Sequence, residues 1–128
     1  MQERIELEIE MLRQRYPQLE RSGNWIRISN YPLPEGWNRT TTDVALQIPP
    51  QYPGTPPYGI YTPGGLLFRE AFPDNYTAAS TQVPFSGTWF VFSWTPADGQ
   101  WRATSDPLTG SNLLNWVIGF AHRFKEGK

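Results

Sequence analysis

Apolar residues recur at helical spacing near the start of the chain. In residues 1–17 this apolar stripe consists of Ile5, Ile9, Leu12 and Tyr16, widened by Leu7 and Met11. Several glutamates, Glu8 among them, precede Arg13 and Arg15, an order that matches the helix dipole. Pro17 is incompatible with the interior of a helix. The pattern therefore predicts an amphipathic helix that ends at Pro17.

A second helical pattern fills residues 111–128. Its apolar positions are Leu113, Val117, Phe120 and Phe124, with Leu114 and Ile118 beside them. Ser111 is the expected N-cap, and His122, Arg123 and Lys125 suit the negative end of the helix dipole. We therefore expect a C-terminal helix in which His122 has a structural role.

Period-2 alternation predicts four strands between the helices, over residues 24–31, 40–49, 58–62 and 88–94. In the second of them, Val44, Leu46 and Ile48 alternate with Ala45 and Gln47. In the fourth, Phe90 and Phe92 lie on one face, and Trp89, Val91 and Ser93 lie on the other. The first two strands are expected to form a hairpin with a long connection. Residues 64–87 read as irregular, and a loop of that length is usually functional or a lid.

Prolines crowd the stretch from Ile48 to Pro63. Because proline cannot donate to a strand ladder, Pro49 and Pro50 are expected to end the second strand. The Tyr52-Pro53-Gly54 turn and the Pro56-Pro57 pair then predict a rigid corner that fixes the connection to the third strand at low entropic cost. A proline-rich ligand for another domain is the alternative, and the strand-like residues on both sides argue against it.

Composition restricts the classes of function. The chain has 128 residues, the size of one domain (residues 1–128), and six Trp, six Tyr and seven Phe supply bulky core material. A net charge of −1 argues against nucleic-acid binding. The lack of cysteine and the single His122 argue against disulfides, a thiolate nucleophile, a metal site or a histidine triad. We expect no cofactor, no membrane span, no secretory signal and a cytoplasmic location.

Motifs in the middle of the chain resemble those of ubiquitin-conjugating (carrier) enzymes. Tyr52-Pro53 and Pro56-Pro57 match the spacing of that family's Tyr-Pro…Pro-Pro element, and Trp101-Arg102 looks like its Trp-Arg segment. The Thr-Asp strand, the "TWFVFSW" segment and "QWRATSDPL" are similar to a bacterial branch of the superfamily. The resemblance implies an α+β fold of the UBC-like type: an N-terminal helix, a four-stranded antiparallel meander sheet, a long loop and a C-terminal helix. It further implies a bacterial ubiquitin-like conjugation pathway, of the kind found in antiphage defence, with a ubiquitin-like protein and its activating enzyme as partners.

The family's cysteine, which holds the ubiquitin-like protein as a thioester, has no counterpart here. By position it falls near residues 91–93, where Ser93 is the available nucleophile and matches the serine of the bacterial branch. A hydroxyl needs a base, and Asp98 and Asp106 are the carboxylates near it in sequence. Thr104 and Ser105 are alternative acceptors. Each of these residues also has a structural interpretation: Ser93 as a strand-end serine bonded to backbone, the other two as turn residues.

Partner contacts are expected at four residues, namely Arg13, Arg15, Trp101 and Arg102. The two arginines lie on the charged face of the first helix, whereas Trp101 and Arg102 either pack the loop over the last helix or contact a partner.

Three interpretations of the function stay open. The chain is a carrier that uses an oxyester or a direct handover, or a non-catalytic adaptor that binds a ubiquitin-like protein or its activating enzyme. The third is that a native cysteine has been replaced.

Overall fold

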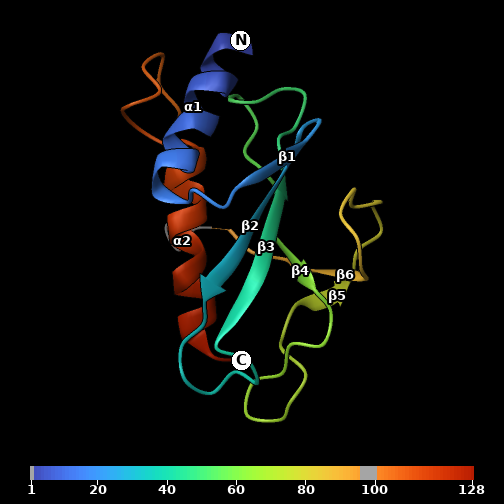
Figure 1. The fold of residues 1–128 in the computed structure, drawn as a ribbon. Coiled ribbons are helices and arrows are strands. Elements are labelled where there is room, and N and C mark those ends of the chain that lie inside the picture. Colours follow the sequence, from blue (N-terminus) through green and yellow to red (C-terminus); the bar gives the residue numbers. More distant parts are fainter. Residues whose placement is uncertain (1, 96–100) are drawn as a thin grey trace.

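The computed structural model describes residues 2–95 and 101–128, which form two helices and a single antiparallel sheet. The elements are α1 (Gln2–Arg15), β1 (Glu20–Ser22), β2 (Trp25–Pro32), β3 (Thr41–Gln47), β4 (Ile60–Pro63), β5 (Tyr76–Ala78), β6 (Trp89–Phe92) and α2 (Leu113–Glu126). Figure 1 shows both helices on one side of the sheet. The expected α+β class, with a helix at each end of the chain, is confirmed. None of the helices in the described segments is long and apolar enough to cross a bilayer.

The sheet has six strands in the order β1-β2-β3-β4-β6-β5, so the expectation of four strands was wrong. The four expected strands are present with shifted ends, and the predicted β2–β3 hairpin is antiparallel, pairing Ile26 with Leu46. The two additional strands have three residues each, and β5 lies inside the stretch that we expected to be irregular. Three residues are too few to display an alternating pattern, and β1 (Glu-Arg-Ser) carries no apolar residue at all.

The main core lies between the sheet and the two helices. The strands contribute Ile26, Ile28, Val44, Leu46, Ile60 and Phe92, and α2 contributes Leu113, Val117, Phe120 and Phe124. These α2 positions were predicted from their spacing and are fully buried. The predicted division of β6 also holds, since Phe92 faces this core while Trp89 and Val91 belong to a second cluster on the other face of the sheet.

The structure corrects two predictions about the helices, one on the buried face of α1 and one on the N-cap of α2. In α1, Ile9 and Leu12 are buried as expected, but Leu7 is 47% exposed and Glu8, which we had placed among the charged residues, is fully buried. In α2, the N-cap is Asn112 rather than Ser111, because the Asn112 side chain accepts a hydrogen bond from the Asn115 N–H at 2.8 Å. The Ser111 hydroxyl instead accepts the Arg102 N–H at 2.8 Å.

Candidate functional site

The proline-rich corner between β3 and β4 is a folded turn. The Tyr52 N–H donates to the Pro49 carbonyl at 3.0 Å, and the Thr55 N–H donates to the Gln51 carbonyl at 3.2 Å. The Tyr52–Pro53 peptide bond is cis. Tyr52 is 3% exposed, so the corner inserts an aromatic ring into the core.

The Glu8 carboxylate connects this corner to both helices. Its Oε1 accepts the Tyr52 hydroxyl at 2.5 Å and the Leu113 N–H, at the start of α2, at 2.7 Å. Its Oε2 accepts the Arg4 Nε at 2.7 Å. Burial, and then the hydrogen bond to Glu8, raise the pKa of Tyr52 far above its usual range. Three donors and a guanidinium charge thus compensate a carboxylate that is out of contact with water.

Trp101 connects the segment that precedes α2 to the corner. Its indole N–H donates to the Pro53 carbonyl at 2.6 Å, and its ring lies 5.7 Å from the Tyr52 ring and 5.8 Å from the Trp116 ring, centroid to centroid. Trp101 is half-buried, whereas the neighbouring Arg102 is exposed. Of the two roles considered for Trp101, packing over α2 is the one for which the structure supplies contacts.

Ser93 follows the last residue of β6 and is exposed. Its backbone N–H donates to the Asn75 carbonyl at 2.9 Å, while its hydroxyl makes no hydrogen bond to any residue in the described parts of the chain. The next residue, Trp94, packs its ring 5.1 Å from Trp116 and 5.6 Å from Phe120. Ser93 is therefore held by its backbone on one side and by an anchored tryptophan on the other, with its hydroxyl open to solvent.

The candidate base Asp106 accepts hydrogen bonds from neighbouring residues of its own turn. Its Oδ1 accepts the Leu108 N–H at 3.0 Å, and its carbonyl accepts the Thr109 N–H at 3.0 Å and the Thr104 hydroxyl at 2.8 Å. Across the described residues, no hydrogen bond joins Asp106 to Ser93. The other candidate base, Asp98, lies outside the described residues.

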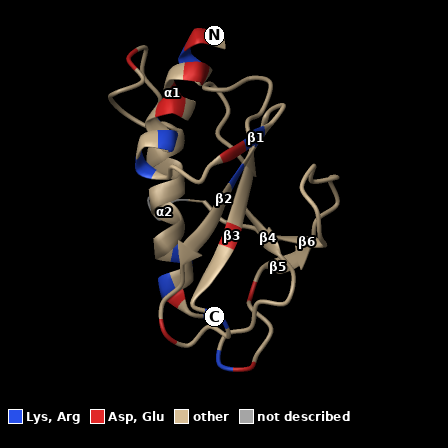
Figure 2. Cartoon of the chain, viewed as in Figure 1, with Lys and Arg blue, Asp and Glu red and all other residues tan. Residues whose placement is uncertain are grey.

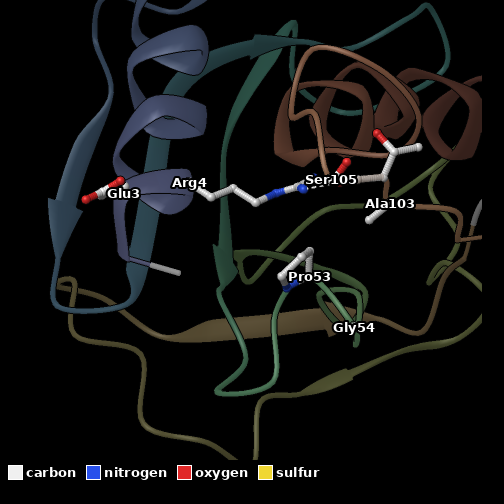
Figure 3. Close-up of a pocket in the computed structure, with 7 residues that line it drawn as sticks. Glu3, Arg4, Pro53, Gly54, Ala103 and Ser105 are labelled. Atoms are coloured by element: carbon white, nitrogen blue, oxygen red, sulfur yellow. Dashed lines mark hydrogen bonds between the residues drawn. The ribbon is translucent and has the colours of Figure 1, made fainter.

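The alternative acceptors Thr104 and Ser105 line a cavity of about 510 Å³. Figure 3 shows Arg4 extending from α1 toward the loop that holds Ser105, while Pro53 and Gly54 of the corner lie opposite that loop. The Arg4 Nη1 donates to the Thr104 carbonyl, so this arginine ties the loop to α1. The Thr104 hydroxyl is bonded within its own turn, to Asp106 and Thr109. Thr104 and Ser105 therefore line this cavity, whereas Ser93 is not among its lining residues.

The remaining predicted partner residues lie on α1. Arg15 is exposed, and its guanidinium carbon lies 5.0 Å from the centre of the Tyr16 ring. Arg13 is partly exposed; the hydrogen bond from Arg21 lowers the pKa of Glu6, and Gln2 and Arg13 add smaller effects in the same direction. Both lie in the last turn of α1, and Figure 2 shows basic residues in blue at that end of the helix, below its red turns.

Two charged residues that we placed on helix faces or ends from the sequence are buried, which we had not predicted. Glu8 is one of them. The other is Arg123, which is 3% exposed, with its Nη2 donating to the Asp74 carbonyl at 2.8 Å and the Lys128 carbonyl at 2.6 Å. Burial lowers the pKa of Arg123. Its guanidinium carbon lies 4.6 Å from the centre of the Phe92 ring. A sequence signal existed for both, since each interrupts the apolar face of its helix at a position where helical periodicity favours an apolar residue.

Comparisons with known proteins bear on this arrangement. The sequence model of prokaryotic E2 family E matches residues 8–117. No match was found among curated proteins or among solved structures. The matched region contains the proline-rich corner, Ser93 and the Trp101 loop, and it extends from the buried Glu8 into α2. The family is therefore the bacterial UBC-like group that the motifs indicate, and the chain belongs to prokaryotic E2 family E.

Proposed function

We propose that this protein is a carrier component of a bacterial ubiquitin-like conjugation pathway and that Ser93 holds the ubiquitin-like protein as an oxyester. The observation that carries the proposal is the location of Ser93. It directly follows β6, eight residues before Trp101, and its side chain is exposed while its backbone N–H is bonded to the Asn75 carbonyl. Membership of prokaryotic E2 family E supports the carrier role and, in general terms, an activating enzyme and a ubiquitin-like protein as partners.

The proposed step is an acyl transfer from a thioester on the activating enzyme. The Ser93 oxygen forms a bond to the acyl carbon at the C-terminus of the ubiquitin-like protein, the carbon–sulfur bond breaks, and the hydroxyl proton ends on the departing thiolate. Because a thioester is an activated donor, holding it close to a hydroxyl lowers the barrier even without a strong base. Lys125 and Lys128 are the only lysines of the chain and both lie near its C-terminus, which favours a hydroxyl oxygen over a lysine amine as the acceptor.

A non-catalytic adaptor is the second candidate function. It is favoured by the lack of cysteine in the sequence and by the position of Asp106, whose carboxylate accepts a backbone N–H in its own turn. An adaptor would bind the ubiquitin-like protein or its activating enzyme through the same fold and carry no acyl group.

An adduct assay separates the two functions. The protein is incubated with its activating enzyme, the ubiquitin-like protein and ATP, and the products are treated with a thiol reductant, with mild base or with hydroxylamine. An oxyester survives the reductant and is cleaved by the other two reagents, whereas an amide survives all three. We expect a reductant-resistant, base-labile adduct that Ser93→Ala abolishes.

Thr104→Ala and Ser105→Ala serve as matched controls, because both residues are exposed hydroxyl candidates in the neighbouring loop. They should leave the adduct unchanged. If either one removes the adduct while Ser93→Ala keeps it, the acceptor is in the loop and the Ser93 assignment is wrong. Binding of either partner without any adduct would support the adaptor. A cytoplasmic location and a role in antiphage defence stay predictions.

A further inference from the structure

The face of the sheet that points away from the helices is apolar. It carries Trp25 from β2, Ala45 from β3, Tyr61 from β4, and Trp89 and Val91 from β6, each no more than 8% exposed. The Trp25 and Tyr61 rings meet edge to face at a centroid distance of 4.9 Å. We call this surface the outer face. Since the helices cover the opposite side, something else must exclude water from it.

The cover is the segment of residues 79–88, which connects β5 to β6 and which we call the strap. Figure 1 shows it in yellow, beyond the sheet on the side away from the helices. Three partly buried strap residues, Ala79, Val83 and Phe85, pack against the outer face. The Phe85 ring lies 6.1 Å from the Trp89 ring, and the Arg27 guanidinium lies 5.3 Å from the centre of Phe85.

In the described part of the chain, the backbone of the strap is hydrogen-bonded at its two ends, and one of these bonds runs from the Gly64 N–H to the Thr88 carbonyl at 2.9 Å. The Ala79 N–H donates to the Trp89 carbonyl at 3.0 Å, and the Trp89 indole N–H donates to the Phe85 and Ser86 carbonyls at 3.1 and 3.2 Å. Within the described residues, no backbone N–H of residues 80–87 donates to a backbone carbonyl. A cavity of about 520 Å³ is lined by the strap and Trp89. A segment with few backbone bonds and open space beside it belongs to the low-stability end of a fold.

We infer that the strap opens reversibly and that, when closed, it prevents the outer face from associating with a second copy of this chain. An uncovered aromatic surface spread over four strands is the kind of patch through which proteins associate. The net charge of −1 provides almost no repulsion between copies. The strap covers, within its own chain, the surface to which a second copy would otherwise bind. This inference does not depend on Ser93 or on any acyl transfer.

Hydrogen exchange of the intact protein, measured by NMR, tests the opening. Two protons report on it: the Ala79 backbone N–H and the Trp89 indole N–H, both of which bond across the strap. The Phe92 backbone N–H, in the centre of the sheet, reports global unfolding. We expect the two strap protons to exchange at least about tenfold faster than the Phe92 N–H, at rates that low denaturant does not change. Equal exchange for all three protons, with the same denaturant dependence, would overturn the reversible opening.

A pair of phenylalanine variants localises the effect. Phe85→Ala removes the main contact of the strap and should speed exchange of the two strap protons by at least about tenfold. Phe72→Ala is the matched control, because Phe72 is 60% exposed and lies outside the strap, and it should leave both rates unchanged. An equal response to the two substitutions would contradict the role of Phe85.

Sedimentation velocity tests what the strap prevents. Replacing residues 80–88 by Asn-Gly joins Ala79 to Trp89, its partner in the β5–β6 register, through a two-residue turn and uncovers the outer face. We expect this variant to form concentration-dependent dimers under conditions in which the wild type sediments as a monomer. If the shortened chain does not fold, the double substitution Val83→Ser, Phe85→Ser retains the length of the strap and should show the same dimer. A folded variant of either kind that stays monomeric at the highest concentration would overturn the inference.

Discussion

At the scale of single residues, the buried polar group with the most consequences is the Glu8 carboxylate. A carboxylate without water is stable only when donors surround it, and here the Tyr52 hydroxyl, the Leu113 N–H and the Arg4 guanidinium do so. Tyr52 therefore has two roles at once. Its ring fills the core beneath the proline-rich corner, and its hydroxyl satisfies Glu8.

Truncation of Tyr52 should be among the most destabilising single changes at the corner. Tyr52→Ala removes a large aromatic ring that is 3% exposed, and we expect the free energy of unfolding to fall by about 3–5 kcal/mol. Tyr58→Ala is the matched control in the same segment, since Tyr58 is 60% exposed and should change stability by less than about 0.5 kcal/mol. Urea unfolding followed by tryptophan fluorescence measures both. A Tyr52→Ala protein as stable as the wild type would show that the corner is not part of the core.

Alkaline pH should destabilise the fold through the same tyrosine. Burial and Glu8 raise the pKa of Tyr52 in the folded protein, whereas an unfolded chain has a tyrosine pKa of about 10. The stabilisation is fully present below about pH 10 and is lost as the pH rises, because only the unfolded chain releases the proton. The loss per tyrosine is at most about 1.4 kcal/mol per pH unit.

The variant that isolates this contribution is Tyr52→Phe, which retains the ring and removes the titrating group. Between pH 10 and pH 11.5 its unfolding free energy should fall less steeply than that of the wild type. Four other tyrosines also have a raised pKa and contribute the slope that remains, namely Tyr16, Tyr31, Tyr61 and Tyr76. Identical slopes for the two proteins would argue against a titrating Tyr52.

At the scale of elements, the sequence predicts those helices and strands in which one hydrophobic pattern repeats several times. α2 is predicted at Leu113, Val117, Phe120 and Phe124, and β3 at its alternating positions, because each has several repeats of one pattern. Three-residue strands such as β5 exist only through their pairing with β6, and no local pattern encodes a partner.

The candidate site likewise has some features that local sequence predicts and others that depend on the tertiary fold. The corner and the exposed strand-end serine follow from local spacing and from the family motifs. The indole bond from Trp101 to the Pro53 carbonyl spans 48 residues, so it depends on the tertiary fold. The burial of Glu8 likewise depends on where α2 begins, since the Leu113 N–H that it accepts is 105 residues away. Such contacts cannot be derived from the residues on either side of them.

The charged face of α1 supports a prediction about partner binding. Arg13 and Arg15 lie in the last turn of α1, and Arg15 is exposed. Reversing both to Glu should weaken binding to the activating enzyme, mainly through a slower association rate that depends strongly on salt. Lys125→Glu with Lys128→Glu is the control, because it makes the same change in net charge in the last turn of α2 and two residues beyond the helix. Equal affinities of the two double variants across a salt series would refute a specific contact on α1.

At the scale of the whole molecule, Glu8 joins three segments that are far apart in the chain. It belongs to α1, it bonds to the proline-rich corner through Tyr52, and it accepts the first N–H of α2. Trp101 adds a fourth segment to the same corner. Trp101 and the start of α2 are therefore positioned by hydrogen bonds to the corner and to Glu8, and not by hydrophobic packing alone.

Loss of Glu8 should consequently lower the stability of the whole fold. Glu8→Ala leaves the Arg4 guanidinium, which is 9% exposed, without its carboxylate, and we expect a loss of about 3–5 kcal/mol in unfolding free energy. Glu3→Ala, one turn earlier and exposed, is the matched control and should cost less than about 0.5 kcal/mol. Because Glu8 and Tyr52 share a hydrogen bond, the double variant Glu8→Ala, Tyr52→Phe should lose less than the sum of the single losses, by about 0.5–3 kcal/mol. Strict additivity would mean that the two residues stabilise their segments independently, and the network would then not be the element that joins α1, the corner and α2.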